Sequence, residues 1–216
     1  LFLRPVSAEA PKVASSQPIQ EVELADSTLA ATETARHQLK YLVNCALPDS
    51  VVLVSVQGRE RFTFPGHLGL APEWLKAPLT PLQERWVSAC MLALTNYAGK
   101  HVDVSLHAKP GSAPFLGQTK EETRAYSLAE GGFFGNLFSP HPVGYVCSVA
   151  RTKLEAQDPV FHDRLCTKPT GETTPDGKPL TFCQFILTGS CSDPTSFIVN
   201  GHTYDEVIFV FLKPTK

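Results

Sequence analysis

Six cysteines constrain this chain more than any other feature of its sequence. They are Cys45, Cys90, Cys147, Cys166, Cys183 and Cys191. No two of them form a C-x-x-C pair and none lies near histidines at zinc-finger spacing, so structural zinc is not expected. An even number, with four of the six in the C-terminal 70 residues among Pro, Gly and Thr, favours disulfides formed in an oxidising compartment. The alternative is a set of reduced, buried cysteines that act as small apolar side chains. The spacing leaves the pairing open.

Charge and hydropathy argue against two classes of function. Nineteen basic and 21 acidic residues leave a net charge of −2 with no Lys/Arg cluster, so no nucleic-acid partner is expected. No apolar run reaches the roughly 18 residues of a membrane-spanning helix. The chain begins at Leu1, and Ala8 and Ala10 suit a signal cleavage site, but Pro11 and the missing charged n-region argue against cleavage there. We expect an exported, extracellular or periplasmic protein, and whether residues 1–10 are a signal remnant or mature chain stays open.

Residues 1–25 are predicted to form an extended arm, and residues 26–216 a single α+β domain. The arm has little apolar surface and three prolines, which prevent a continuous helix. Val22 and Leu24 share one face of an extended segment, with Ile19 nearby. This pattern suits a strand that adds to the exposed sheet edge of an adjacent subunit.

Two helices are expected in the N-terminal half. The first covers residues 26–45, with Asp26 or Ser27 as its cap. The second begins with a capping box formed by Thr80 and Gln83 and ends at Gly99. The side chains expected to form its buried stripe are Leu82, Trp86, Ala89 or Cys90, Ala93 and Tyr97.

Strand patterns dominate the rest of the chain. The β-branched run 51–56 is typical of a strand buried on both faces, and further candidates are 59–64, 101–108, 143–150, 180–189, 196–199 and 206–212. Asn200-Gly201 predicts a hairpin turn. The fold class is therefore α+β: two helices with a β-rich antiparallel sheet or sandwich of six to eight strands, stapled by disulfides.

The stretch "AEGGFFGNLFSPHP" at residues 129–142 places two phenylalanines between glycines. We interpret it as a turn whose Phe133 and Phe134 plug the core, with Glu130 and Asn136 capping its backbone groups. In the alternative, Trp74, Glu130, Phe133, Phe134 and Asn136 form an exposed recognition surface for a sugar or a protein.

No catalytic, cofactor or metal site is predicted. The serine-nucleophile and phosphate-loop motifs are missing, and disulfides would consume the thiols. His101, Asp103, Ser105 and His107 alternate on one strand face, but the two histidines would stand about 20 Å apart, too far to share an ion. We interpret these four residues as the polar outer face of a half-buried strand, and His162-Asp163 as a solvated loop pair.

Several strings resemble a family of exported proteins of myxobacteria and related Gram-negative bacteria to which no activity is assigned. These strings are CALP at 45–48, GHLGLAPEW at 66–74, RWVSAC at 85–90 with a following N-x-x-G, and EGGFFGNLF at 130–138. They fall within residues 41–147. The resemblance implies a shared architecture and export, and it suggests that Cys45 and Cys90 are framework cysteines. We predict that these two pair with each other and that the C-terminal cysteines pair among themselves.

These features lead to one functional hypothesis and one alternative. The hypothesis is a non-enzymatic extracellular or periplasmic subunit of a surface filament or large complex, acting through self-association or with other protein subunits. The alternative is a secreted hydrolase or carbohydrate-binding protein that uses the Gly-Phe segment 130–136.

Overall fold

The computed structural model describes residues 30–57, 59–109, 116 and 119–215. Its helices are α2 (Glu33–Ala46), α3 (Pro81–Leu94) and α4 (Lys120–Ala125), with 3-10 turns η2 (Pro72–Leu75), η3 (Glu155–Gln157), η4 (Pro159–Asp163) and η5 (Pro194–Phe197). Its strands are β1 (Val52–Gln57), β2 (Glu60–Pro65), β3 (Val104–Ala108), β4 (Leu128–Asn136), β5 (Val143–Ser148), β6 (Pro169–Thr173), β7 (Pro179–Thr181), β8 (Ile186–Ser190), β9 (Ile198–Val199), β10 (His202–Thr203) and β11 (Ile208–Leu212).

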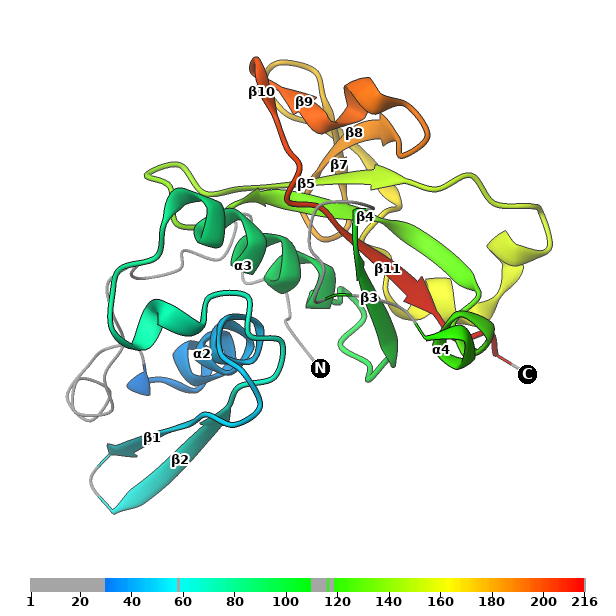
Figure 1. Cartoon of the computed structure of the whole chain (residues 1–216). Helices are drawn as coiled ribbons and strands as arrows, with labels where there is room; N and C mark the ends of the chain where they lie inside the picture. The colour runs from blue at the N-terminus through cyan, green and yellow to red at the C-terminus, as the bar shows by residue number, and fades with distance from the viewer. Residues whose placement is uncertain (1–29, 58, 110–115, 117–118, 216) are drawn as a thin grey trace.

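The main sheet has seven strands in the order β3-β11-β4-β5-β8-β7-β6. Every neighbouring pair is antiparallel except β5 with β8, which run parallel. Helix α3 lies across one face of this sheet, and α2 packs on the far side of α3 (Figure 1). The fold is therefore α+β and rich in strands, as predicted, with one parallel pair in an otherwise antiparallel sheet.

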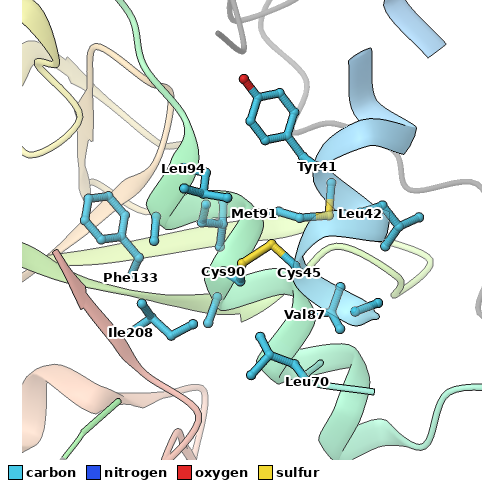
Figure 2. Close-up of a cluster of buried hydrophobic side chains, with 14 of the residues drawn as sticks. Tyr41, Leu42, Cys45, Leu70, Val87, Cys90, Met91, Leu94, Phe133 and Ile208 are labelled. Carbon is cyan, nitrogen blue, oxygen red and sulfur yellow. A yellow bond between two sulfur atoms is a disulfide. The ribbon is translucent and has the colours of Figure 1, made fainter. Parts of the chain in front are cut away.

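The main core lies between α2, α3 and the sheet, and a disulfide crosses it. Cys45 of α2 bonds to Cys90 of α3, as predicted, among Leu42, Met91 and other buried apolar side chains (Figure 2). The covalent link closes a 45-residue separation. It fixes the two helices against each other at the point where both are fully buried.

A second, smaller core covers the opposite face of the sheet. It contains Phe134, Tyr145, Phe197 and Val207, and the Cys147–Cys191 disulfide closes it at one side. The third disulfide joins Cys166 to Cys183. All six cysteines are thus paired and the C-terminal four pair among themselves, as predicted. Such a set of bonds is typical of an oxidising compartment.

Two predicted local signals are confirmed. Thr80 and Gln83 form the capping box of α3, because the Thr80 hydroxyl accepts from the Gln83 N–H and the Gln83 side chain accepts from the Thr80 N–H. Asn200 and Gly201 both adopt positive φ in the turn between β9 and β10. Residues 196 and 197, predicted as strand, belong instead to η5.

The helix boundaries differ from the sequence prediction. The N-cap of α2 is Thr32, whose side chain accepts from the Ala35 N–H, and not Asp26 or Ser27, which lie outside the described residues. Helix α3 ends at Leu94, before the predicted Gly99. Leu82 and Tyr97, both predicted in the buried stripe, are exposed. The buried part of α3 runs only from Trp86 to Leu94, and Tyr97 lies beyond the end of the helix.

Residues 129–136 form the long central strand β4 and not a turn, so that prediction is wrong. The glycines are needed there for a different reason. A Cβ on Gly131 would lie 2.4 Å from the carbonyl oxygen of Cys147 on β5, so only a glycine allows the two strands to approach so closely. The prediction that Phe133 and Phe134 are buried is confirmed, because both are 0% exposed.

Candidate functional site

The five residues of the predicted recognition surface do not lie on one surface. Phe133 points into the main core, with its ring 6.2 Å from that of Phe185, while Phe134 points into the second core. Trp74 is buried in η2, on the α2 side of the molecule. These three aromatic rings therefore have no exposed face with which to contact a sugar or a partner.

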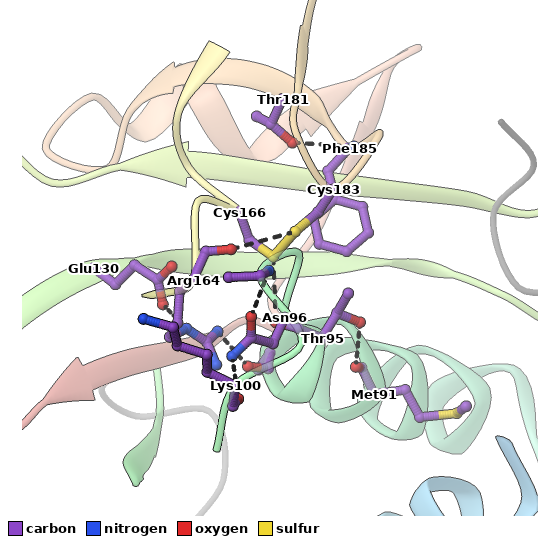
Figure 3. Close-up of a disulfide and its surroundings, with 12 residues drawn as sticks. Met91, Thr95, Asn96, Lys100, Glu130, Arg164, Cys166, Thr181, Cys183 and Phe185 are labelled. Atoms are coloured by element: carbon purple, nitrogen blue, oxygen red, sulfur yellow. Dashed lines mark hydrogen bonds and ion pairs between the residues drawn. A yellow bond between two sulfur atoms is a disulfide. The ribbon is translucent and has the colours of Figure 1, made fainter. Parts of the chain in front are cut away.

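Glu130 is held in a buried ion pair. The prediction that it caps backbone groups is therefore wrong. The Nε atom of Arg164 donates to its Oε2 over 2.6 Å, and the two side chains are 2% and 1% exposed (Figure 3). Arg164 Nη2 also donates to the Ala93 carbonyl at the end of α3, over 2.7 Å. Asn136 does cap backbone as predicted, since its Oδ1 accepts from the Phe138 N–H. Buried charges of this kind persist only when paired.

A disulfide fixes the position of Arg164. Cys166, two residues further on, is bonded to Cys183, and Leu165 between them has a φ of 62°. The Arg164 carbonyl accepts from the Tyr97 N–H just after α3. These constraints hold the guanidinium beneath the C-terminal end of α3, where the helix dipole favours a cation.

A cleft of about 400 Å³ opens beside β3, at the edge of the main sheet. Its apolar lining consists of Leu68, Leu94, Val102, Val104, Leu106 and Leu116, and its polar lining of Asn44, His67, His101, Asp103, Glu122 and Arg164. The size falls in the range of small-molecule sites, about 300–1,000 Å³. Arg164 is the most buried of the polar groups, whereas His101 and Asp103 lie at the exposed rim.

Ser105, His107 and Glu122 form a polar cluster next to the cleft. The Ser105 Oγ lies 2.5 Å from His107 Nε2 and donates to Glu122 Oε1 over 2.6 Å. The Ser105 hydroxyl thus lies within hydrogen-bond distance of both the His107 ring and the Glu122 carboxylate. The cluster therefore joins α4 to β3.

The burial of Ser105 and His107 contradicts the prediction of a polar outer face. Both side chains lie against the sheet, and the His107 ring stacks on Phe211 with centroids 4.4 Å apart. Burial lowers the pKa of His107, while the nearby Glu122 charge opposes that shift. The prediction therefore holds for His101 and Asp103, which are exposed, and fails for Ser105 and His107, where Glu122 of α4, a helix that was not predicted, contacts Ser105.

Histidines and acids do not gather into a metal site in the described part of the chain. No group of three or more His, Cys, Asp or Glu side chains has the geometry to hold an ion there. The nearest approach to a pair in the cleft is His101 Nδ1 with Asp103 Oδ1, 3.6 Å apart. Asp163 of the predicted solvated loop pair His162-Asp163 accepts from Lys100 Nζ over 2.5 Å.

A second candidate surface is the outer face of the hairpin formed by β1 and β2. This ribbon extends away from the main sheet (Figure 1). Its inner face, with Leu53 and Phe64, packs on α2, and Arg36 stacks over Phe62. Its outer face carries Val52 and Val56, which are 47% and 49% exposed. The prediction that strand 51–56 is buried on both faces is therefore wrong.

Arg164 is not among the residues predicted from the sequence, whereas the position of Glu130 contains a signal for a buried partner. A glutamate between the apolar residues of a buried strand requires a partner. No local pattern marks Arg164, since the approach of residues 130 and 164 depends on the tertiary fold. The predicted arm residues Ile19, Val22 and Leu24 lie outside the described residues.

Comparison of the chain with protein-family models, curated proteins and solved structures finds no match. The family resemblance drawn from the sequence strings thus stays a prediction. Among the described helices, none is long and apolar enough to cross a membrane.

Proposed function

We propose that this protein acts without catalysis, outside the cytoplasm, by associating with further copies of itself in a filament or large complex. The observation that carries the proposal is the exposed row of valines on strand β1 of the β1–β2 hairpin. Three disulfides support the assignment to an oxidising compartment.

The β1 half of the hairpin's outer face is apolar, whereas the β2 half carries Thr63 and Arg61. Val52, Val54 and Val56 follow one another along this side of β1, opposite Pro65, Thr63 and Arg61 of β2. A two-stranded ribbon is marginally stable in water unless its faces are covered. A β-branched run of this kind suits a strand with cover on both sides, and a second subunit would supply the missing cover.

The backbone of the same three valines forms an open sheet edge. The Gly66 N–H donates to the Val51 carbonyl over 2.8 Å, so residues 51 and 66 form a hydrogen-bonded pair of the antiparallel ladder. Hydrogen-bonded and non-hydrogen-bonded pairs alternate along the ladder from this point. Residues 52, 54 and 56 belong to the non-hydrogen-bonded pairs, so their N–H and C=O groups point away from β2. No described residue pairs with this edge as a strand. Such an edge is a template for an added strand.

The occupant we assign to this edge is the arm of an adjacent copy. Its segment PIQEVELA places Val22 and Leu24 on one face, which would continue the apolar stripe of β1. Strand addition of this kind is driven by main-chain hydrogen bonds, with alternate side chains giving specificity. A head-to-tail contact closes only if its rotation makes a ring, so filaments are the general result.

The test replaces Val54 by lysine in the full chain. A lysine on an edge strand opposes strand addition, so V54K is expected to sediment as a monomer at concentrations where the wild-type protein assembles. The matched control is L154K, at a leucine that is 81% exposed and remote from the hairpin in sequence. A V22S/L24S variant should behave like V54K. A wild-type protein that stays monomeric at high concentration, or a V54K protein that assembles normally, would contradict the proposal.

A further inference from the structure

Strand β3 is an edge strand of the main sheet, and part of its backbone points outward (Figure 1). It pairs with β11 on one side, and no strand in the described part of the chain pairs with its other side. The Lys109 N–H donates to the Val207 carbonyl over 2.9 Å, so residues 109 and 207 form a hydrogen-bonded pair that continues the register of the antiparallel ladder. Because hydrogen-bonded and non-hydrogen-bonded pairs alternate, the N–H and C=O groups of residues 104, 106 and 108 point away from β11.

The cleft beside β3 follows this edge, because residues from both faces of the sheet line it. Val104 and Leu106 line it from the face that packs on the main core. Glu122 also lines it and accepts from Ser105, whose side chain points to the opposite face, since side chains alternate along a strand. The cleft therefore lies along the edge, next to the outward N–H and C=O groups.

The lining of the cleft is apolar on one side and acidic on the other. Its apolar residues are Leu68, Leu94, Val102, Val104, Leu106 and Leu116. Asp103 has the same parity along the chain as Ser105, so it lies on the side of Glu122, and its side chain is 64% exposed. Neither acid forms an ion pair with a lysine or an arginine within the described ranges. Glu130 offsets the charge of Arg164 at 2.6 Å, so the two acids leave the cleft with a net negative charge.

We propose that the β3 edge binds an extended segment of a partner protein in which apolar residues alternate with lysine or arginine. Such a segment adds to the sheet as a strand and forms main-chain hydrogen bonds with residues 104, 106 and 108. Its side chains alternate between the two faces. The apolar ones contact Val104 and Leu106, and the cationic ones lie towards Asp103 and Glu122.

The charge of this edge excludes the arm that we assign to the β1 edge. The arm segment PIQEVELA carries Glu21 and Glu23, and both would be repelled by the acids of the cleft. The inference therefore concerns a different edge and a different partner, and it does not depend on the assembly proposed above.

The first experiment titrates the full-length, oxidised protein with two capped peptides, Val-Lys-Val-Lys-Val and Val-Glu-Val-Glu-Val, and follows binding by NMR and calorimetry. The lysine peptide should bind saturably and shift the resonances of β3. The glutamate peptide should bind at least about tenfold more weakly, because like charges then face one another. Equal binding of the two peptides, or no saturable binding of the lysine peptide at millimolar concentration, would overturn the inference.

Backbone N-methylation of the lysine peptide tests whether it binds as a strand. In an antiparallel addition the N–H groups of its valines face β3, and in a parallel addition those of its lysines do. Methylation of one of these two sets should therefore abolish binding, and methylation of the other should preserve it. If both methylated peptides bound as tightly as the parent, the contact would be one of charge alone and the inference would be wrong.

A charge reversal in the protein tests the location. Asp103→Lys should weaken binding of the lysine peptide by about fivefold, the upper range for one exposed ion pair, and should strengthen binding of the glutamate peptide. The matched control is Asp176→Lys, because the Asp176 side chain is 63% exposed in the turn after β6, at the opposite edge of the main sheet. It should change neither affinity, and thermal unfolding verifies that both variants fold. An undiminished affinity in Asp103→Lys, or an equal loss in the two variants, would place the peptide elsewhere.

Discussion

Replacing Glu130 by glutamine should destabilise the protein severely, because it leaves Arg164 as a buried charge without its counterion. The two side chains are 1% and 2% exposed and lie 2.6 Å apart. Breaking a buried pair by removing one partner costs about 3–5 kcal/mol. Glutamine keeps the shape of the side chain, so the loss reflects charge and not a cavity. A loss near that range would be a large part of the roughly 5–15 kcal/mol by which domains are stable.

A matched control separates burial from charge pairing in general. Lys100 and Asp163 form an ion pair at the surface, where the lysine side chain is 65% exposed. Exposed pairs contribute about 0–1 kcal/mol, so Asp163→Asn should have little effect. The two variants together compare the same kind of interaction in two environments.

Urea denaturation monitored by the fluorescence of Trp74 and Trp86 measures both effects. The two tryptophans are buried in the core and report on its loss. The reasoning would be refuted if the unfolding free energy of Glu130→Gln, calculated from its midpoint at an unchanged denaturant slope, lay within about 1 kcal/mol of the wild-type value. It would mean that Arg164 finds another partner or reaches water without cost.

Three further outcomes are expected. Phe134→Ala should cost about 3–5 kcal/mol in denaturant unfolding because the ring fills the second core, whereas Leu154→Ala at an 81% exposed position should be silent; equal effects would contradict the packing. Replacing Cys45 and Cys90 together by alanine should cost about 4 kcal/mol in the chain-entropy model, and thiol labelling of the denatured, unreduced wild type should find no free thiol. Burial lowers the folded-state pKa of His107 below its ordinary value of 6.5, so the unfolded state binds the proton more readily. Stability should therefore fall as pH decreases from about 6.5 towards that lowered pKa. The variant His107→Asn should flatten this dependence of stability on pH, and an unchanged dependence would contradict the assignment.

Local signals in the sequence predicted local structure well. The capping box of Thr80 and Gln83 acts within one turn of helix, and the Asn200-Gly201 turn is set by two consecutive dihedral pairs. Neither depends on distant residues, so each can be derived from its own stretch of chain. The even cysteine count likewise indicated disulfides, although the pairing needed more than spacing.

Features set by distant contacts could not be derived in the same way. The glycines of β4 suggest a turn when their segment is considered alone, but the close approach of the Cys147 carbonyl to Gly131 arises only when β4 pairs with β5. Phe133 and Phe134 were correctly placed in the interior because aromatic side chains bury large areas in any arrangement. The buried pair of Glu130 with Arg164 required the fold itself.

The Cys166–Cys183 disulfide and the buried Glu130–Arg164 ion pair act on the same loop. Cys166 and Cys183 are separated by 17 residues, so their bond contributes about 3 kcal/mol in the chain-entropy model. That is comparable with the penalty for an uncompensated charge at Arg164, two residues before Cys166. A buried pair offsets its desolvation only when its geometry is held tightly, and a side chain on a free loop would lose that geometry. The Cys166–Cys183 disulfide therefore holds the loop that keeps Arg164 against Glu130 and the end of α3.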